Sequence, residues 1–253
     1  MSSALTKGTA AQGQDTPSKP STYALHPVQT KQTPLSQTAR HALPVLLAGV
    51  FAVRFPALVA NPVSTMATTL PLTTALQIAY AVLCLPVAGG SSTKTQRKTK
   101  PRAGESSKKR SAGEGVAASN AVVTSLLSLL LALLVTPFLH VAMVLFGAPF
   151  LTHGAHTFLC AAHLAVLALF PLFYVHGVDG AAWATVGGFG APLDETFGGL
   201  VGGVVGAWLG AVPIPLDWDR EWQRWPVTIL CGLYGGYVLG RVIGGTLVWG
   251  KRF

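Results

Sequence analysis

Long apolar runs alternate with shorter polar connections along most of the chain. Six runs approach the roughly 20 residues that a helix needs to cross a bilayer. They cover about residues 42–60, 69–88, 122–146, 155–175, 197–212 and 227–249. The pattern predicts an all-α polytopic integral membrane protein with about six transmembrane helices. The fifth run is short and rich in glycine, so five or seven crossings remain as alternatives.

Composition supports this class. Charged residues make up 11% of the chain and hydrophobic residues 50%, with a mean hydropathy of +0.49, whereas roughly a quarter of an ordinary soluble protein is charged. From residue 121 to residue 250 only nine side chains are Asp, Glu, Lys or Arg. So few charges cannot cover the surface of a water-soluble domain. A cytosolic enzyme, a secreted domain and a disordered chain are therefore excluded.

The polar segments divide the chain into four parts. Residues 1–40 form a tail rich in Thr, Ser, Gln, Ala and Pro, which we expect to be flexible and cytosolic. Residues 41–90 hold two transmembrane helices and residues 91–120 a basic cytosolic loop. Residues 121–253 hold four helices, with a luminal loop at 210–226 that is rich in Trp and Asp.

Basic residues predict the orientation. The net charge is +9, but fourteen of the 18 Lys and Arg residues fall in the tail, the basic loop and the last three residues. With six crossings these segments share one side of the membrane, and such an excess marks the cytosolic side. Both termini are therefore expected in the cytosol. The position of the charges argues against a nucleic-acid partner.

The loop "GAVPIPLDWDREWQRWP" at Gly210–Pro226 carries the densest chemistry. Asp217, Asp219 and Glu221 alternate, so in an extended conformation they would share one face. Three carboxylates at that spacing could hold a divalent cation, or one could act as a general base.

A structural interpretation of the same loop also stands. Trp218, Trp222 and Trp225 are the side chains expected at the level of the lipid headgroups. Arg220 and Arg224 would then offset the acidic residues. No His or Cys accompanies the acids, so the interfacial interpretation is favoured.

Three histidines lie near one helical face at the start of the fourth run. His153, His156 and His163 have offsets of three and seven residues. Histidines within a membrane can bind a metal or relay protons. His153 and His156 lie near the luminal boundary, where a neutral imidazole is inexpensive, so hydrogen bonding between helices is favoured.

Glycines recur every four residues in the last two helices. The two rows are Gly198, Gly202, Gly206 and Gly210, and Gly232, Gly236, Gly240 and Gly244. Each row gives its helix a flat ridge that another backbone can approach closely. We expect these two helices to pack tightly, either against each other or against a partner subunit.

Two arginines lie inside predicted spans. Arg54 and Arg241 are costly in lipid unless each reaches the interface or finds an anion. Neither has a carboxylate within a predicted span. Reaching the boundary is the simpler expectation, and binding a lipid phosphate is the alternative.

Several segments resemble one known family. They are "TYALHP" at 22–27, "RFPALVANPVSTM" at 54–66, "FLTHGAHTFLCAAHLA" at 150–165, and the 210–226 loop with the glycine helix after it. Together they resemble the phosphatidylinositol-glycan class F (PIG-F) family of glycosylphosphatidylinositol (GPI) anchor biosynthesis. The resemblance implies a multi-pass protein of the endoplasmic reticulum membrane that stabilises the large GPI ethanolamine-phosphate transferases. Those partners carry the metal-dependent catalytic domain, so we assign this chain no catalytic residue, cofactor or metal.

The leading hypothesis is thus a non-catalytic membrane subunit. Its last two helices would dock on the transferase, and its Trp-rich loop would contact the luminal domain or the GPI precursor. The alternative is a metal-dependent lipid-linked transferase or phosphatase that uses Asp217, Asp219 and Glu221. A third hypothesis is a transporter or scramblase that uses Arg54, Arg241 and the histidines.

Overall fold

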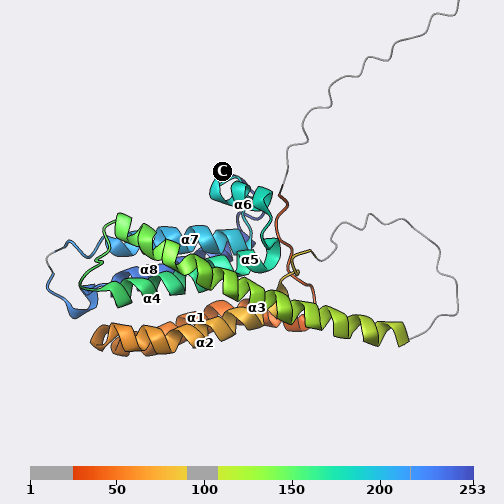
Figure 1. Cartoon of the computed structure of the whole chain (residues 1–253), viewed down its shortest axis with the longest axis horizontal. Coiled ribbons are helices and arrows are strands. Elements are labelled where there is room, and N and C mark those ends of the chain that lie inside the picture. Colours follow the sequence, from red (N-terminus) through yellow and green to blue (C-terminus); the bar gives the residue numbers. More distant parts are fainter. Residues whose placement is uncertain (1–24, 90–107, 217) are drawn as a thin grey trace, which may run out of the picture.

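The computed structural model describes residues 25–89, 108–216 and 218–253, with the backbone alone for 108–119. These residues form helices and no strands (Figure 1). The elements are α1 (Pro34–Ala60), α2 (Pro62–Cys84), α3 (Lys108–Leu145), α4 (Gly154–Leu164), the π-turn η1 (Ala165–Leu169), α5 (Phe170–His176), α6 (Gly180–Gly187), α7 (Glu195–Ala211), the 3₁₀ turn η2 (Glu221–Gln223) and α8 (Val227–Gly245).

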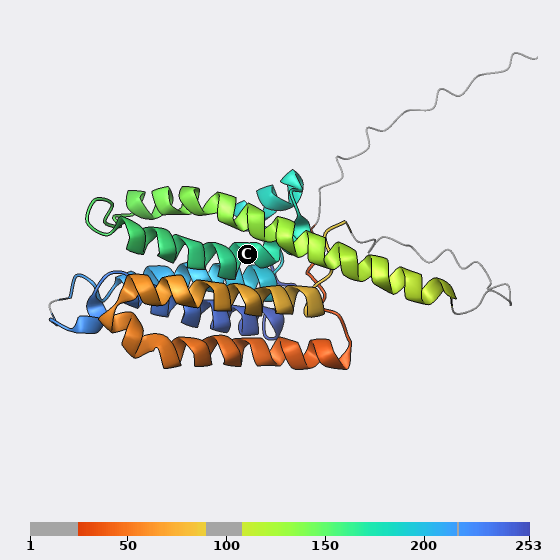
Figure 2. The same ribbon diagram turned by 60° about the horizontal axis from the view of Figure 1, so that its bottom comes forward.

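The long helices run side by side as a bundle (Figures 1 and 2). Five stretches in the described residues are long and apolar enough to cross a membrane, namely α1, α2, Asn120–Leu145 of α3, Gly154–His176 and α8. The all-helical polytopic class is therefore confirmed. The remaining predicted span, α7, has 17 residues and packs along α8. A sixth crossing stays a prediction.

The first two helices begin earlier than predicted. The Thr33 hydroxyl caps α1 by accepting from the Ser36 amide at 3.2 Å, so residues 34–40 are helix rather than tail. Asn61 separates α1 from α2, which starts at Pro62 instead of residue 69. Helix α2 starts there because Pro62 occupies its first turn and the Asn61 side chain accepts from the Ser64 amide. Hydroxyls in its polar first turns, such as that of Thr69, bond to carbonyls one turn back. The flexible tail predicted for residues 1–24 lies outside the described residues.

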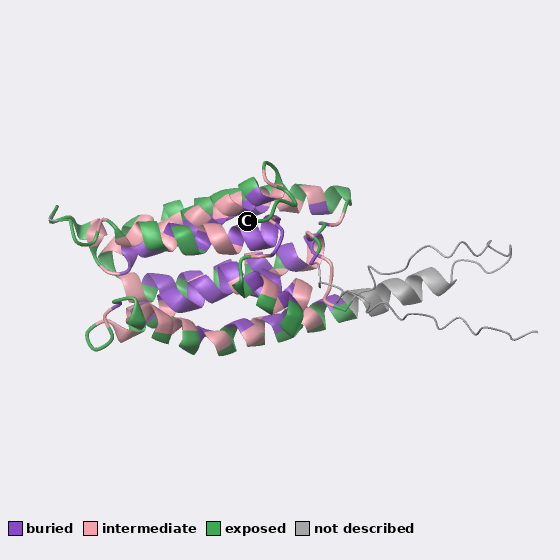
Figure 3. Ribbon diagram, turned by 90° about the horizontal axis from the view of Figure 1, so that it is seen from above, coloured by how far each residue is buried: buried purple, intermediate pink, exposed green. Residues whose placement is uncertain are grey.

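The third and fourth spans also differ in detail. Helix α3 begins at Lys108, so the end of the predicted basic loop is helical, and residues 90–107 lie outside the described part. The fourth span, Gly154–His176, contains the π-helical segment η1, and 72% of an 18-residue apolar stretch within it is buried, the highest share of the five. Figure 3 shows buried positions concentrated inside the bundle. Helix α6 was not predicted; Asp179 caps it by accepting from the Ala181 amide at 3.0 Å.

The bundle has two ends, which we name by their contents. The loop end holds residues 146–153 and 212–226. The terminal end holds residues 25–33 and 246–253, where Arg252 donates to the Leu25 carbonyl at 2.6 Å and the Leu193 amide donates to the Lys251 carbonyl at 2.7 Å. The start and end of the described chain thus lie together, as an even number of crossings requires. Which end is cytosolic stays a prediction.

Candidate functional site

The two glycine rows face each other across the α7–α8 contact. A Cβ on Gly198 would lie 2.5 Å from the Gly240 carbonyl oxygen, and one on Gly206 would lie 2.8 Å from the Gly236 Cα. Gly202 is placed in the same way against Gly236 and Gly240, and Gly232 against Gly206. The structure therefore shows the first of the two alternatives, packing within the chain. These glycine faces are covered and not open to a partner subunit.

An ion-paired cluster at the terminal end corrects the expectation for Arg241. Its guanidinium contacts the Glu195 carboxylate at 2.9 Å, and the side chains are 2% and 5% exposed. The second oxygen of Glu195 pairs with Arg40. The Tyr80 hydroxyl also donates to Glu195 at 2.8 Å, and the Arg241 guanidinium lies 3.7 Å from the centroid of the Tyr80 ring. Arg241 thus neither extends to the interface nor lacks a carboxylate, and it is buried away from lipid phosphates.

Glu195 lies two residues before the predicted fifth span, in what the hydrophobic pattern indicated was a connection. The carboxylate of the preceding residue, Asp194, caps α7 by accepting from the amides of Thr196 and Phe197 at 2.8 and 3.0 Å. This cap starts the helix at Glu195, two residues before the predicted span. An acidic side chain in the first turn also interacts favourably with the helix dipole. The strong Asp-Glu-Thr start signal was the clue that could have placed it.

A second polar group joins the helices near the centre of the bundle. The Tyr234 hydroxyl lies 2.8 Å from both the Thr73 hydroxyl and the His163 Nδ1. The other ring nitrogen of His163 lies 3.2 Å from the Met66 carbonyl oxygen. His163 is fully buried in these contacts and does not join His153 and His156. The expected interhelical hydrogen bonding is present for His163.

The loop end gathers the other two histidines and the Trp-rich loop. The rings of His153 and His156 have centroids 4.9 Å apart. One turn into α4, the Thr157 hydroxyl accepts from the indole of Trp225 at 3.1 Å. This bond fixes the end of the 210–226 loop over the start of α4.

The two acidic residues of that loop that the structure describes, Asp219 and Glu221, do not lie on one extended segment. Asp219 has a φ of 47°, and Glu221 begins the η2 turn, where its carboxylate pairs with Arg224. Asp217 lies outside the described residues. Among the residues that are described, no three His, Cys, Asp or Glu side chains lie close enough to hold a metal ion.

The tryptophans of the loop are held in a defined shape. Trp218 is 53% exposed, and its ring centroid lies 5.8 Å from that of Trp222. The Gln223 side chain donates to the carbonyls of Pro213 and Leu216 and accepts from the Arg220 amide. The loop therefore presents an aromatic and charged surface on a closed turn.

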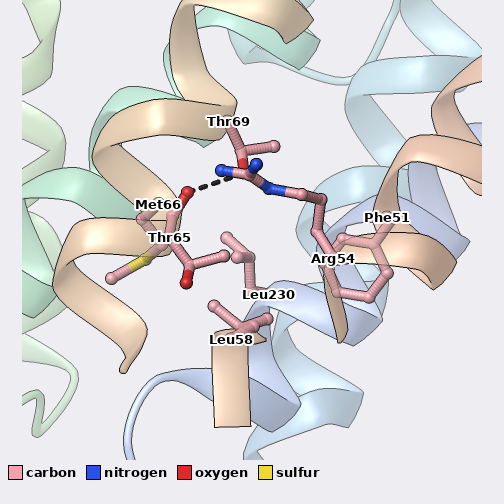
Figure 4. Close-up of a pocket in the computed structure, with 7 residues that line it drawn as sticks. All are labelled: Phe51, Arg54, Leu58, Thr65, Met66, Thr69 and Leu230. Atoms are coloured by element: carbon pink, nitrogen blue, oxygen red, sulfur yellow. Dashed lines mark hydrogen bonds between the residues drawn. The ribbon is translucent and has the colours of Figure 1, made fainter. Parts of the chain in front are cut away.

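Arg54 lies between α1 and α2 beside a small pocket (Figure 4). Its Nε donates to the Thr69 hydroxyl at 3.2 Å, and its Nη2 donates to the Thr68 hydroxyl. Within the described residues no carboxylate pairs with it. Two hydroxyls thus hold the guanidinium near the loop end of the helices, and a lipid phosphate as its counter-ion stays a prediction.

Fold and polar groups together define a polytopic membrane protein whose buried charges hold its helices to one another. The family described as GPI biosynthesis protein family Pig-F matches residues 42–245. The chain belongs to this family, and it is a protein of GPI-anchor biosynthesis.

Individual relatives agree with the family. The chain is 62% identical to glycosylphosphatidylinositol anchor biosynthesis protein 11 of Neurospora crassa, over 100% of this chain and 96% of the relative. It is 51% identical to the protein of the same name in Pyricularia oryzae, over 92% and 84% of the two chains. A human protein named GPI ethanolamine phosphate transferase, stabilizing subunit, is 38% identical over 45% of this chain and 53% of its own length. No solved structure matches the chain.

Proposed function

We propose that this chain is a non-catalytic subunit of the endoplasmic reticulum membrane that stabilises a GPI ethanolamine-phosphate transferase. The transferase would add phosphoethanolamine to a mannose of the GPI precursor. The observation that carries the proposal is the name of the human relative, which describes a stabilizing subunit of such a transferase. The mouse relative has the same name and is 36% identical over 118 residues.

The contacts of the buried ionisable groups support a structural role. Both oxygens of Glu195 are occupied by Arg40, Arg241 and Tyr80. The two ring nitrogens of His163 likewise lie within hydrogen-bond distance of the Tyr234 hydroxyl on α8 and the Met66 carbonyl oxygen on α2. A general acid or base must come within hydrogen-bond reach of the reacting group of its substrate. These groups instead connect α1, α2, α4, α7 and α8, as expected of a rigid scaffold.

The partner contact is proposed for the loop end rather than for the glycine rows. The loop residues Trp218, Asp219 and Arg220 are exposed, and Trp222 is half-buried against them. Aromatic and arginine side chains presented on a fixed turn are typical anchors of protein interfaces. Trp218 and its neighbours would contact the transferase's luminal domain or the headgroup of the GPI precursor.

Loss of the chain tests the proposal. Cells depleted of it should lose transferase protein, because the unassembled partner is degraded, and should accumulate GPI precursors that lack phosphoethanolamine. Trp218→Ala with Trp222→Ala should reproduce part of this loss. The matched control is Trp208→Ala, an exposed tryptophan on α7. A depleted cell that keeps full transferase levels but stops making product would instead indicate a catalytic role.

A further inference from the structure

A polar cavity opens at the terminal end of the bundle, away from the Trp-rich loop. Its volume is about 470 Å³, which falls within the range of sites that hold small molecules. It is lined by Gln29, Thr30, Gln32, Arg40, Gly245, Thr246 and Trp249. The lining therefore combines segments from before α1, within α1 and at the end of α8.

The cavity offers hydrogen-bonding groups that the described protein leaves free. Arg40 uses its Nε on Glu195 and its Nη2 on the Gly245 carbonyl, and its side chain is 22% exposed. A guanidinium carries five donors, so further donors remain. Within the described part of the chain, the Thr30 hydroxyl and the side-chain amide of Gln29 make no hydrogen bond, and Gln29 is exposed.

The charge of this end favours an anion. The carboxylates of Asp194 and Glu195 are already bonded to protein donors. The cations that lie on or next to the lining segments are Lys31, Arg40, Lys251 and Arg252. A phosphate in the cavity would accept from Arg40 and lie within the field of the other cations, since planar guanidinium donors match phosphate oxygens.

The surroundings favour a lipid over a free ion. Thr246 lines the cavity at the end of α8, and Leu239, Val242 and Ile243 precede it by seven, four and three residues. These spacings place Leu239, Val242 and Ile243 on one side of α8. Thr246, the residue after the helix, donates its hydroxyl to the Val242 carbonyl at 2.6 Å. The three apolar side chains are exposed on a membrane-spanning helix. A polar cavity therefore continues into an apolar strip, as a headgroup continues into acyl chains.

We propose that this cavity binds the headgroup of an anionic glycerophospholipid. Arg40 holds the phosphate, and Gln29 and Thr30 bond to headgroup hydroxyls or ester oxygens. Trp249 borders the headgroup at the interface, and the acyl chains lie along Leu239, Val242 and Ile243. The site is at the opposite end of the bundle from the proposed partner contact, so it does not depend on the proposed function.

The test uses the purified full chain in mild detergent and native mass spectrometry. Phosphatidylglycerol should remain bound and raise the melting temperature. Two controls should neither remain bound nor raise the melting temperature. One is diacylglycerol with the same acyl chains, and the other is inorganic phosphate. If diacylglycerol is retained as well as phosphatidylglycerol is, the proposal is overturned, because binding then depends only on an apolar surface. Stabilisation by inorganic phosphate equal to that by the lipid would overturn it in favour of an ion site.

Variants locate the binding. Gln29→Leu with Thr30→Val removes hydrogen-bonding groups without touching the Arg40–Glu195 pair, and should weaken phosphatidylglycerol binding by about ten-fold. Arg40→Lys keeps the charge but loses the planar guanidinium with its paired donors. This variant should weaken phosphatidylglycerol binding more than the Gln29→Leu, Thr30→Val variant does. Thr152→Val, at an exposed threonine of the loop end, should bind as the parent does. If the cavity variants keep parental affinity while correctly folded, the site is not this cavity.

Discussion

Glu195, the first residue of α7, lies 2.9 Å from Arg241 on α8, and both side chains are almost entirely buried. The pair lies at the terminal end, beside the contact of Gly198 on α7 with Gly240 and Gly244 on α8. Arg40 and Tyr80 add α1 and α2 to the same carboxylate. One acidic side chain thus ties four helices together at the point where close backbone packing starts.

Breaking this pair should strongly destabilise the chain. Glu195→Gln leaves Arg241 as an uncompensated buried cation, and such losses cost about 3–5 kcal/mol. Thermal unfolding of the purified protein in detergent would measure the effect. Glu195→Gln combined with Arg241→Met removes both charges, so its loss should be smaller than the sum of the single losses. Strict additivity would show that the two side chains are not coupled.

The glycine contact predicts a sharp difference between two adjacent positions. Gly236→Ala places a Cβ 2.8 Å from the Gly206 Cα and should cost about 1–3 kcal/mol, because two backbones must move apart. Gly235 has nothing within 4 Å of an added Cβ, so Gly235→Ala should be neutral or gain up to about 1 kcal/mol from helix propensity. Melting curves of the two variants provide the comparison. Similar losses at both positions would refute the face-to-face packing.

Two buried tyrosines should respond differently to loss of the hydroxyl. Tyr234→Phe leaves Thr73 and His163 without a shared partner and should cost about 1–3 kcal/mol. The hydroxyl of Tyr174 is buried and has no hydrogen-bond partner among the described residues. Tyr174→Phe should therefore be neutral or stabilising. Chemical or thermal denaturation would show whether the order is as stated.

The acidic loop separates the scaffold from the catalytic alternative. Asp219 is exposed and makes no ion pair within the described residues. On the scaffold account, Asp219→Asn should leave chain level, transferase level and phosphoethanolamine transfer close to parental. Metabolic labelling of GPI precursors would measure the transfer. Normal assembly with abolished turnover would support a catalytic metal site instead.

The sequence predicted elements whose signals are local. The apolar runs predicted the membrane-spanning helices, because a helix that crosses a bilayer needs about 20 apolar residues. The four-residue glycine spacing predicted the faces that meet in the α7–α8 contact. Side-chain contacts between residues far apart in the sequence could not be predicted from it. Glu195 was missed because an error of two residues at a helix start moved it outside the span. His163 was grouped with His153 and His156 by spacing, although its partners Met66 and Tyr234 come from two other helices.

The central claim is that this chain works as the bound companion of a larger transferase. Affinity purification of the full chain from membranes in mild detergent, followed by mass spectrometry of what is recovered, tests it most directly. The account predicts recovery of a GPI ethanolamine-phosphate transferase at near-equal amount, with transfer activity only when that partner is present. Recovery of the chain alone, with phosphoethanolamine transfer of its own, would contradict it.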